Sequence, residues 1–177
     1  MRRLVILGAG GYGRTVADIA RQSGRYEEIL FLDDHSDLAA GRCEEYRRFV
    51  RAEDRVITEC YPAFGNNAAR LEWIRRWTDS GLRVPVLIHP SAYVSPEAEI
   101  AAGTVVLPKA VINTGCRIGA GCILNCGAIV DHDCILEDGC HICLGAIIKG
   151  ENRIPEGTKI EAGVVVERGA YPLSGRM

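Results

Sequence analysis

Two acids and an imidazole stand side by side at Asp131, His132 and Asp133, inside a long apolar tract. A carboxylate next to a histidine can orient the ring and stabilise its protonated form, which makes the pair a candidate general base. A solvated turn would hold the same residue types without any chemistry. The interpretation of His132 therefore depends on the elements that position it and on the residues around it.

A six-residue repeat surrounds these residues and predicts the element that carries them. Aliphatic residues recur at every sixth position without interruption: Ile88, Val94, Ile100, Val106, Ile112, Ile118, Leu124, Val130, Leu136, Ile142, Ile148, Ile154, Ile160 and Val166. Glycine recurs between them, at Gly103, Gly115, Gly121, Gly127, Gly139, Gly145, Gly157, Gly163 and Gly169. This pattern is typical of a parallel β-helix, in which three units close one triangular coil. We expect residues 86–177 to form this domain, with a little under five coils.

The repeat also predicts which side chains are stacked, because residues three units apart lie in one column. Gly150 is predicted directly above His132, where a missing side chain leaves a backbone amide next to the candidate base. Asp131 is predicted to pair with Lys149 one coil above it. Asp133 then remains free to hold the imidazole.

Eight cysteines require an explanation in a chain of 177 residues. Cys116, Cys122, Cys134 and Cys140 occupy the small-residue position of the repeat and are predicted to stack in pairs. Side chains stacked in parallel register rarely reach the torsion angles of a disulfide. We therefore expect structural thiols and neither a disulfide framework nor a metal site.

The first 85 residues show a different pattern, in which apolar strands alternate with amphipathic helices. We expect strands in RLVILGAG (3–10), EEILFLDD (27–34) and RVITECYPAFGNN (55–67), and helices in GRTVADIARQSG (13–24) and NAARLEWIRRWTDSG (67–81). This alternation is typical of βαβ units with a parallel sheet. Residues 1–85 are therefore predicted to be a Rossmann-like module.

A glycine-rich junction between the first strand and helix fits the GxGxxG pattern through Gly8, Gly10 and Gly13. Asp33 follows 20 residues after Gly13, at the end of the second predicted strand. This spacing is that of a dinucleotide fingerprint, with backbone amides for phosphate and an acid for ribose. The module has about half the size of a full dinucleotide domain, so a single nucleotide diphosphate fits better than NAD. A tight turn with a capping acid is the alternative.

The overall composition disfavours several classes of partner. A formal net charge of −2 provides no general positive field for nucleic acid or an anionic membrane surface. No apolar run approaches the length of a membrane span. The basic and apolar N-terminus, MRRLVIL, is too short for a signal peptide and continues into the glycine-rich turn, so a cytoplasmic protein is expected.

The chain as a whole resembles the NeuD/PglD-type sugar O- and N-acetyltransferases. The segments that carry this resemblance are GAGGYG (8–13), FLDD (31–34), FGNN (64–67), IHPSA (88–92), IVDHDC (129–134) and LGAIIKG (144–150). The resemblance implies a Rossmann-like α/β module followed by a left-handed parallel β-helix. It also implies transfer of acetyl from acetyl-CoA, without a metal, to an amino or hydroxyl group of a UDP-linked 4-amino-4,6-dideoxy sugar in bacterial glycan synthesis. Such enzymes are homotrimers with active sites between subunits.

The same resemblance assigns roles to individual residues. His132 matches the general base, Asp133 the acid that orients it, His141 a second histidine near acetyl-CoA, and Gly150 the glycine whose amide faces the thioester carbonyl. The loop of Gly8, Gly10, Gly11, Tyr12 and Gly13 would hold phosphate, with Asp33, Asp34, Gly65 and Asn66 around the uridine and ribose. Because His141 lies nine residues after His132, half a coil away, one site that uses both histidines requires two subunits.

Two departures from the family pattern bear on binding. Tyr12 stands where relatives often have histidine, which affects the sugar contacts. The sequence ends at GAYPLSGRM (169–177), where relatives usually add a coil and a GVPAK-like ending that helps to hold coenzyme A. From this we expect coenzyme A to be held differently, more weakly or not at all.

Three other functions were weighed. A non-catalytic nucleotide-sugar-binding or assembly protein with a shortened β-helix is the main alternative. A γ-type carbonic anhydrase uses the same helix with zinc-binding histidines about five residues apart, a spacing that the four histidines here lack. An NAD-dependent enzyme is disfavoured by the small first module and by the absence of a catalytic pair near it.

Overall fold

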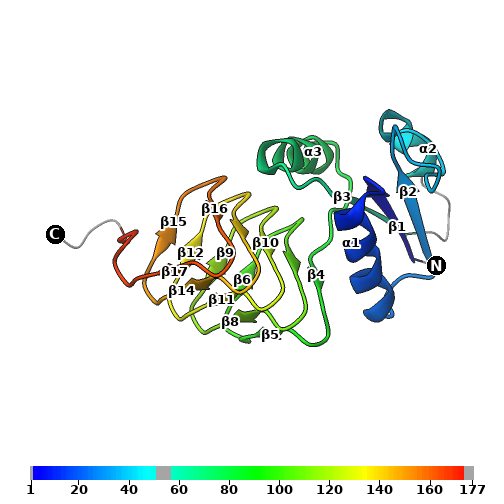
Figure 1. The fold of residues 1–177 in the computed structure, drawn as a ribbon. Helices are drawn as coiled ribbons and strands as arrows, with labels where there is room; N and C mark the ends of the chain where they lie inside the picture. Colours follow the sequence, from blue (N-terminus) through cyan, green and yellow to red (C-terminus); the bar gives the residue numbers. More distant parts are fainter. Residues whose placement is uncertain (1, 51–56, 174–177) are drawn as a thin grey trace.

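The computed structural model describes residues 2–50 and 57–173. A small α/β part leads into a long stack of short strands (Figure 1). The elements of the first part are β1 (Arg2–Leu7), α1 (Gly11–Gln22), β2 (Glu28–Leu32), the 3₁₀ turn η1 (Cys43–Glu45), α2 (Tyr46–Phe49), β3 (Ile57–Pro62) and α3 (Asn67–Asp79).

The N-terminal sheet is parallel, with strand order β2-β1-β3, as the βαβ pattern predicts. Helix α1 packs on this sheet through Val16, Ala17 and Ile19, the apolar positions of its helical repeat. Arg55 and Val56, the first residues of the predicted third strand, lie outside the described residues. The short helices η1 and α2 were not predicted, because their few residues show no helical period. Tyr46 of α2 anchors them against Trp77 of α3.

Within residues 57–173, the β-helix consists of fourteen two-residue strands arranged in three parallel sheets. Face 1 contains β4 (Leu87–Ile88), β7 (Val105–Val106), β10 (Ile123–Leu124), β13 (His141–Ile142) and β16 (Lys159–Ile160). Face 2 contains β5 (Tyr93–Val94), β8 (Val111–Ile112), β11 (Ile129–Val130), β14 (Ile147–Ile148) and β17 (Val165–Val166). Face 3 contains β6 (Glu99–Ile100), β9 (Arg117–Ile118), β12 (Ile135–Leu136) and β15 (Arg153–Ile154).

The predicted register is confirmed in every strand. Each aliphatic repeat residue is the second residue of its strand and pairs with the equivalent residue 18 positions away, as Leu124 does with Ile142. These side chains and the small residues between them fill the interior in one continuous buried cluster. The nine predicted repeat glycines all have positive φ, which explains their recurrence at the corners.

The stacked cysteines lie inside this cluster as free thiols, as predicted. Each donates to a backbone carbonyl further along the coil. Cys116 Sγ lies 3.0 Å from the carbonyl oxygen of Asp131, and Cys122 Sγ lies 3.2 Å from that of Glu137. These contacts are consistent with a structural role for the thiols.

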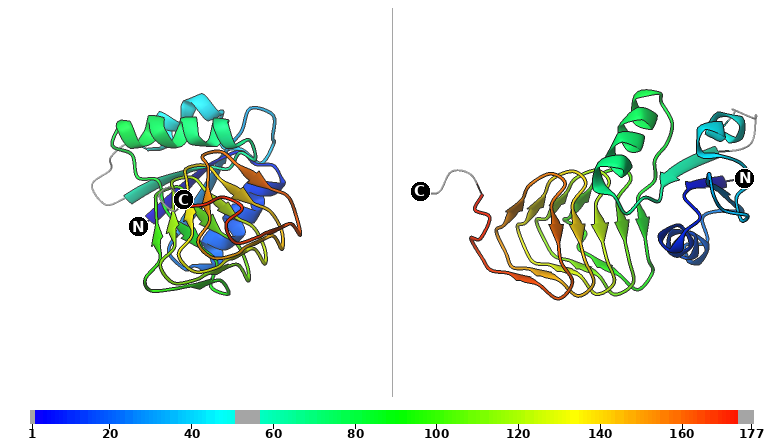
Figure 2. Two further views of the ribbon diagram at one scale, coloured as in Figure 1. Left: turned by 90° about the vertical axis from the view of Figure 1, so that its left-hand side faces the viewer. Right: turned by 45° about the horizontal axis from the view of Figure 1, so that its top comes forward.

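Helix α3 lies over one corner of the coil, where face 3 turns into face 1 (Figures 1 and 2). A Cβ atom at Gly103 or Gly121 would lie 2.6 or 2.7 Å from Cδ1 of Ile74. At Gly139 it would lie 2.5 Å from Cδ1 of Leu71. At these three positions of the corner, glycine is therefore required for space as well as for its φ angle. We call it the covered corner.

The two parts of the chain also share buried apolar residues. Leu87, Val105 and Ile123 of face 1 belong to the same cluster as Leu4 and Ile6 of β1. The first coils are thus packed directly against the N-terminal sheet, on the side where α1 lies.

Candidate active site

His132 lies at the corner where face 2 turns into face 3, which we call the open corner. Its Nδ1 atom lies 2.9 Å from Oδ2 of Asp133, so Nδ1 carries a hydrogen that it donates to the carboxylate and Nε2 is left as the acceptor. The hydrogen bond to Asp133, and next the charge of Asp131, raise the pKa of His132 above its usual value. This is the arrangement that a general base needs, and the predicted contact is confirmed.

The backbone of Asp133 is in the left-handed region, with φ of +56°. Only three non-glycine residues in the described ranges have positive φ, the others being Lys109 and Glu151. Such a conformation costs free energy and often marks a functional position. Gly115, one coil below, leaves the space for the carboxylate, because a Cβ atom there would overlap Oδ1 of Asp133.

Gly150 lies against the imidazole, as the column predicts. A Cβ atom on Gly150 would lie 2.8 Å from His132 Nε2 and 2.9 Å from Cε1. Any side chain here would displace the ring. The backbone N–H of Gly150 also helps to lower the pKa of Asp131, after the larger effects of the His132 amide and Asn113. The amide of Gly150 is therefore on the side of the Asp131 carboxylate, which lies beside the base.

The predicted ion pair between Asp131 and Lys149 is wrong. Asp131 Oδ1 instead accepts from Asn113 Nδ2, one coil below, at 3.0 Å. Lys149 Nζ pairs with Glu167 one coil above, at 2.5 Å. The column therefore divides into two pairs. Asn113 at one end bonds to Asp131, and Glu167 at the other end pairs with Lys149. Asp131 is left facing His132, with Oδ2 at 3.9 Å from Nε2.

His141 does not join His132 within one chain. It is the first residue of β13 and points outward from face 1, whereas the open corner lies on the opposite side of the coil. Its Nε2 lies 3.3 Å from Nδ2 of Asn125, a neighbour that the sequence analysis did not identify. Burial, together with the charges of Arg70 and Lys159, lowers the pKa of His141 to about 4, so this ring is neutral at physiological pH.

The glycine-rich loop has the packing that a phosphate-binding turn requires. Gly8 has φ of +97°, and a Cβ on Gly13 would overlap the carbonyl oxygen of Gly8, so α1 can approach β1 only without a side chain there. Gly10 and Gly11 have open space at their Cβ positions. Gly10 is the N-cap of α1, so the amides of the first helical turn point toward this open space.

The acids and amides predicted around the nucleotide meet at the same sheet edge, because the three strands are parallel. Asp33 supports the loop directly, since Oδ2 accepts from the Ala9 amide at 2.7 Å. Asp34 Oδ1 accepts from the Cys43 amide at 3.2 Å. Asn66 caps α3 through the Ala69 amide at 2.9 Å. The predicted grouping is present, although each of these side chains also stabilises its own turn.

Gly65 and Asn66, at the end of β3, are both exposed at this edge. A Cβ atom on Gly65 would meet no other atom within 4 Å. The edge is therefore open above β3 as well as above the glycine-rich loop.

Tyr12 connects this edge with the β-helix. Its hydroxyl oxygen lies 2.8 Å from that of Tyr61, a buried residue of β3 that the sequence analysis missed. Both tyrosines pack in the cluster that contains Ile123 and Cys126 of the coil. Cys126 follows Asn125, the neighbour of His141, so the nucleotide-side edge and face 1 are contiguous within one chain.

Comparison with known proteins agrees with this geometry. Residues 3–77 match the PglD N-terminal domain family. The acetyltransferase domain of PglB from Neisseria gonorrhoeae FA1090 is 38% identical and superposes with a TM-score of 0.88, over 93% of this chain and 82% of that one. The chain belongs to the NeuD/PglD-type sugar acetyltransferase family. A second structure of that PglB domain contains acetyl coenzyme A and superposes with a TM-score of 0.86.

Two further relatives extend the NeuD/PglD-type comparison. UDP-N-acetylbacillosamine N-acetyltransferase of Bacillus subtilis (strain 168) is 32% identical over 112 residues, which are 60% of this chain and 52% of that protein. The chain therefore spans about half the length of this curated relative. A variant of perosamine N-acetyltransferase from Caulobacter crescentus, in complex with CoA and GDP-perosamine, is 25% identical with a TM-score of 0.70, over 92% of this chain and 90% of that one.

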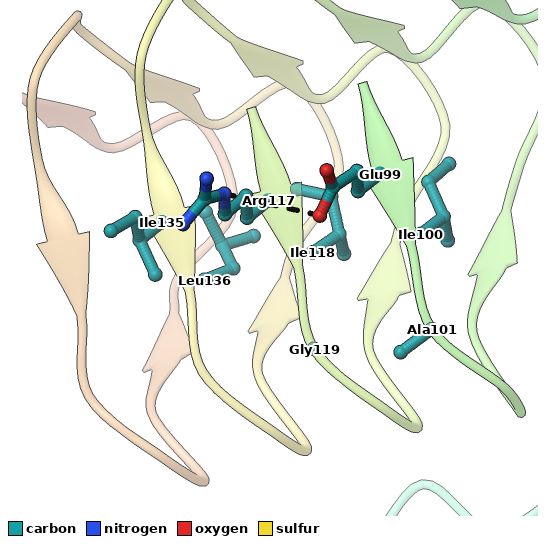
Figure 3. Close-up of a pocket in the computed structure, with 8 residues that line it drawn as sticks. All are labelled: Glu99, Ile100, Ala101, Arg117, Ile118, Gly119, Ile135 and Leu136. Carbon is teal, nitrogen blue, oxygen red and sulfur yellow. Dashed lines mark ion pairs between the residues drawn. The ribbon is translucent and has the colours of Figure 1, made fainter. Parts of the chain in front are cut away.

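Two of the hollows in the described part of this NeuD/PglD-type fold have the same volume. The one in Figure 3, about 390 Å³ in volume, is on the outer side of face 3, where Arg117 Nε and Glu99 Oε2 are 3.9 Å apart. It contains none of the predicted site residues. The other, also about 390 Å³, lies beside α1 and is lined by Arg14, Asp18, Arg21, Phe31 and Leu38. Arg14 is one turn from the open N-terminus of α1.

Within the described ranges, no cluster of three or more histidine, cysteine or acidic residues could hold a metal ion. Among the described helices, none has the length and apolar character that a membrane span requires. Residues 174–177, which end the segment thought to affect coenzyme A binding, lie outside the described residues.

Proposed function

We propose that this chain transfers the acetyl group of acetyl-CoA to the amino group of a UDP-linked 4-amino-4,6-dideoxy sugar. The observation that carries the proposal is the open corner, where Asp133 orients His132 and Gly150 leaves its backbone beside Nε2. The PglB domain that is 38% identical has been seen with acetyl coenzyme A. Acetyl-CoA and nucleotide sugars are cytoplasmic metabolites, so we assign the reaction to the cytoplasm.

The proposed reaction is direct transfer, with His132 as the base. The sugar amine attacks the thioester carbonyl carbon and gives a proton to Nε2, while Asp133 stabilises the imidazolium. As the C–N bond forms and the C–S bond breaks, the amide of Gly150 donates to the developing oxyanion. The coenzyme A thiolate leaves and takes up the proton from His132. A positioned base of this kind contributes roughly 10²–10⁴-fold.

The nucleotide sugar is proposed to bind at the sheet edge of residues 1–85. Gly10, Gly11 and the first turn of α1 offer amides to the diphosphate, and Arg14 adds a positive charge next to them. Gly8, Tyr12 and Gly13 shape the loop. The surrounding residues Asp33, Asp34, Gly65 and Asn66 would face the uridine and ribose. We favour UDP over GDP because the UDP-sugar relative is more similar, at 32%, than the GDP-perosamine relative, at 25%.

A homotrimer would complete the site, because His132 and His141 lie on opposite sides of the coil in one chain. The outward residues of face 2 form an apolar column that a second chain could cover: Tyr93, Val111, Ile129, Ile147 and Val165. Tyr93 and Val165 are 56% and 45% exposed in the single chain, which is unusual for an uncovered column of this length. His141 and the nucleotide edge of one subunit would then meet His132 of the next.

Release of coenzyme A thiol with UDP-linked 4-amino-4,6-dideoxy sugars tests the proposal. We expect turnover with wild-type protein and a loss of roughly 10²–10⁴-fold for His132→Ala, with an unchanged melting temperature. Near-normal turnover by His132→Ala would overturn the base assignment. Failure to bind acetyl-CoA at millimolar concentration, by isothermal titration calorimetry, would instead favour a non-catalytic nucleotide-sugar-binding or assembly protein.

Subunit mixing tests the composite site. His132→Ala and His141→Ala chains are each expected to be nearly inactive. Refolding or coexpressing them together should restore part of the activity, because some interfaces then contain His132 from one chain and His141 from the other. Absence of any restoration in proven mixed trimers would show that the two histidines do not share an intersubunit site.

A further inference from the structure

Arg70, in the first turns of α3, is fully buried although it carries a permanent charge. Its hydrogen bonds to the described residues all go to uncharged acceptors. The Nε atom donates to the carbonyl oxygen of Gly121 at 2.8 Å, and one terminal nitrogen donates to that of Phe64 at 2.9 Å. The other terminal nitrogen donates to Oδ1 of Asn67 at 2.8 Å and to the carbonyl oxygen of Gly139 at 3.2 Å.

This cation has no acidic partner within the described ranges 2–50 and 57–173, where the ion pairs all involve other residues. Burying an unpaired charge is costly, so Arg70 is not explained by an ion pair that stabilises the fold. A neutral side chain could fill the same space at lower cost. The charge and the planar fork therefore call for a role beyond packing.

The four acceptors belong to two places that the proposed reaction needs to hold together. Phe64 and Asn67 flank the Gly65–Asn66 turn at the nucleotide edge. Gly121 and Gly139 belong to the covered corner of two successive coils, and Gly139 lies two residues before His141. One guanidinium thus connects the nucleotide edge to the strand that carries His141.

The charge of Arg70 also acts on the side chains around this junction. It adds to burial in lowering the pKa of His141. Burial raises the pKa of Tyr12 well above its usual value and raises that of Tyr61 to about 12. The charge of Arg70 opposes both increases. The other groups that act on His141 are Lys159, which lowers its pKa, and Glu161, which raises it.

We infer that Arg70 is a positioning residue, which fixes the strand that carries His141 relative to the nucleotide edge of the same subunit. A neutral His141 can accept from or donate to a thioester-bearing ligand without adding a second proton to the site. The link to catalysis rests on the proposed function, whereas the effect on His141 is independent of any turnover.

The decisive experiment measures the titration of His141 by NMR of its ring carbons, in wild type and in Arg70→Gln, Arg70→Lys and Arg75→Gln. Arg70→Gln should raise the pKa of His141, because a nearby like charge is removed. Arg70→Lys keeps the charge and should leave the pKa low. Arg75 lies on the same helix but is exposed and pairs with Glu156 at 2.9 Å, so Arg75→Gln is the matched control and should change nothing.

Kinetics separate positioning from simple stabilisation. Arg70→Lys, which keeps the charge but loses the fork to Gly121 and Gly139, should lower kcat several-fold while KM for acetyl-CoA changes little. A wild-type kcat in Arg70→Lys would overturn the positioning role. A His141 pKa in folded Arg70→Gln equal to that of wild type would overturn the electrostatic role. If Arg70→Gln does not fold, the same comparison is made with Arg70→Met, and the same equality overturns the inference. If no variant or wild type has turnover, the proposed function fails while the NMR result still stands.

Discussion

The covered corner and the open corner of the β-helix share one backbone geometry but differ in composition. At the covered corner the residue with positive φ is glycine in every coil: Gly103, Gly121, Gly139 and Gly157. At the open corner the equivalent positions are Gly115, Asp133, Glu151 and Gly169, all with positive φ. The same turn therefore accepts an acid on one side of the coil and only glycine on the other.

The difference lies in what each corner faces. At Gly103, Gly121 and Gly139, beneath α3, a side chain would meet Leu71 or Ile74, so glycine is needed there for space as well as for conformation, whereas a Cβ atom on Gly157 would meet no other atom within 4 Å. At the Asp133 position of the open corner only the conformational cost remains, on the order of 1–3 kcal/mol for a non-glycine residue. Asp133 bears this cost, and its carboxylate accepts the hydrogen bond from Nδ1 of His132. The open corner thus carries a carboxylate that can take part in chemistry, at some loss of stability. The covered corner has no space for such a side chain beneath Leu71 and Ile74.

Replacing Asp133 by glycine should have the largest effect on this contrast. The turn keeps its φ angle without strain, so the free energy of unfolding should rise by about 1 kcal/mol. Activity should fall roughly 10- to 100-fold, as part of the 10²–10⁴-fold contribution of a positioned base. Urea unfolding and thiol release measure the two effects.

Lys109→Gly is the matched control for Asp133→Gly. Lys109 also has positive φ, of +59°, but lies at the third corner, where face 1 turns into face 2. It should gain similar stability and keep full activity. A stable, fully active Asp133→Gly protein would mean that the strained acid has no role in the reaction.

A comparison of two glycines should separate space from conformation. Gly139 and Gly127 have nearly equal φ, +69° and +68°, yet only Gly139 lies against Leu71. Gly127→Ala should cost about 1 kcal/mol from the left-handed conformation alone. Gly139→Ala should cost roughly 1–3 kcal/mol more, because the added methyl displaces Leu71. Equal losses in urea unfolding would show that α3 yields freely and does not restrict this corner.

The regular part of this molecule could be predicted from sequence almost completely, since one period determines strand, column and interior position together. The register, the free cysteines and the contacts of Gly150 and Asp133 with His132 all follow from it. The period could not predict side-chain pairing along a column. Asp131 had two possible neighbours, and the choice of Asn113 over Lys149 depends on local rotamers.

Contacts between the two parts were also beyond the sequence. No repeat relates α3 to the coil, so Tyr61 and Asn125 gave no signal and Arg70 gave only a hint. The one available hint was an arginine at an inward position of an amphipathic helix. Buried Arg70 shows that such an exception to the helical pattern can mark a contact between distant segments.

The pH dependence of the reaction should reflect the open corner alone. His132 must be neutral to act as a base, and its pKa is raised, first by Asp133 and then by Asp131. The activity should therefore decline as pH falls through a value above about 6.5, the ordinary pKa of histidine. Asp133→Asn should move this acid limb of kcat/KM to lower pH. An acid limb that stays in place in Asp133→Asn would assign it to another group.

The smallest expected effect tests how the column beside His132 is paired. Asp131 faces the imidazole and is bonded to Asn113, whereas Lys149 pairs with Glu167 and both of these side chains are largely exposed. Asp131→Asn should therefore move the acid limb of kcat/KM to lower pH. The shift should be smaller than in Asp133→Asn, because Asp131 contributes only its charge. Lys149→Gln should leave the limb unchanged, with a stability change within about 0.5 kcal/mol. If Lys149 instead neutralised Asp131 in solution, its removal would strengthen the field at His132 and move the limb to higher pH. A shift of the acid limb to higher pH in Lys149→Gln would thus support the pairing of Asp131 with Lys149 that the column alone suggested.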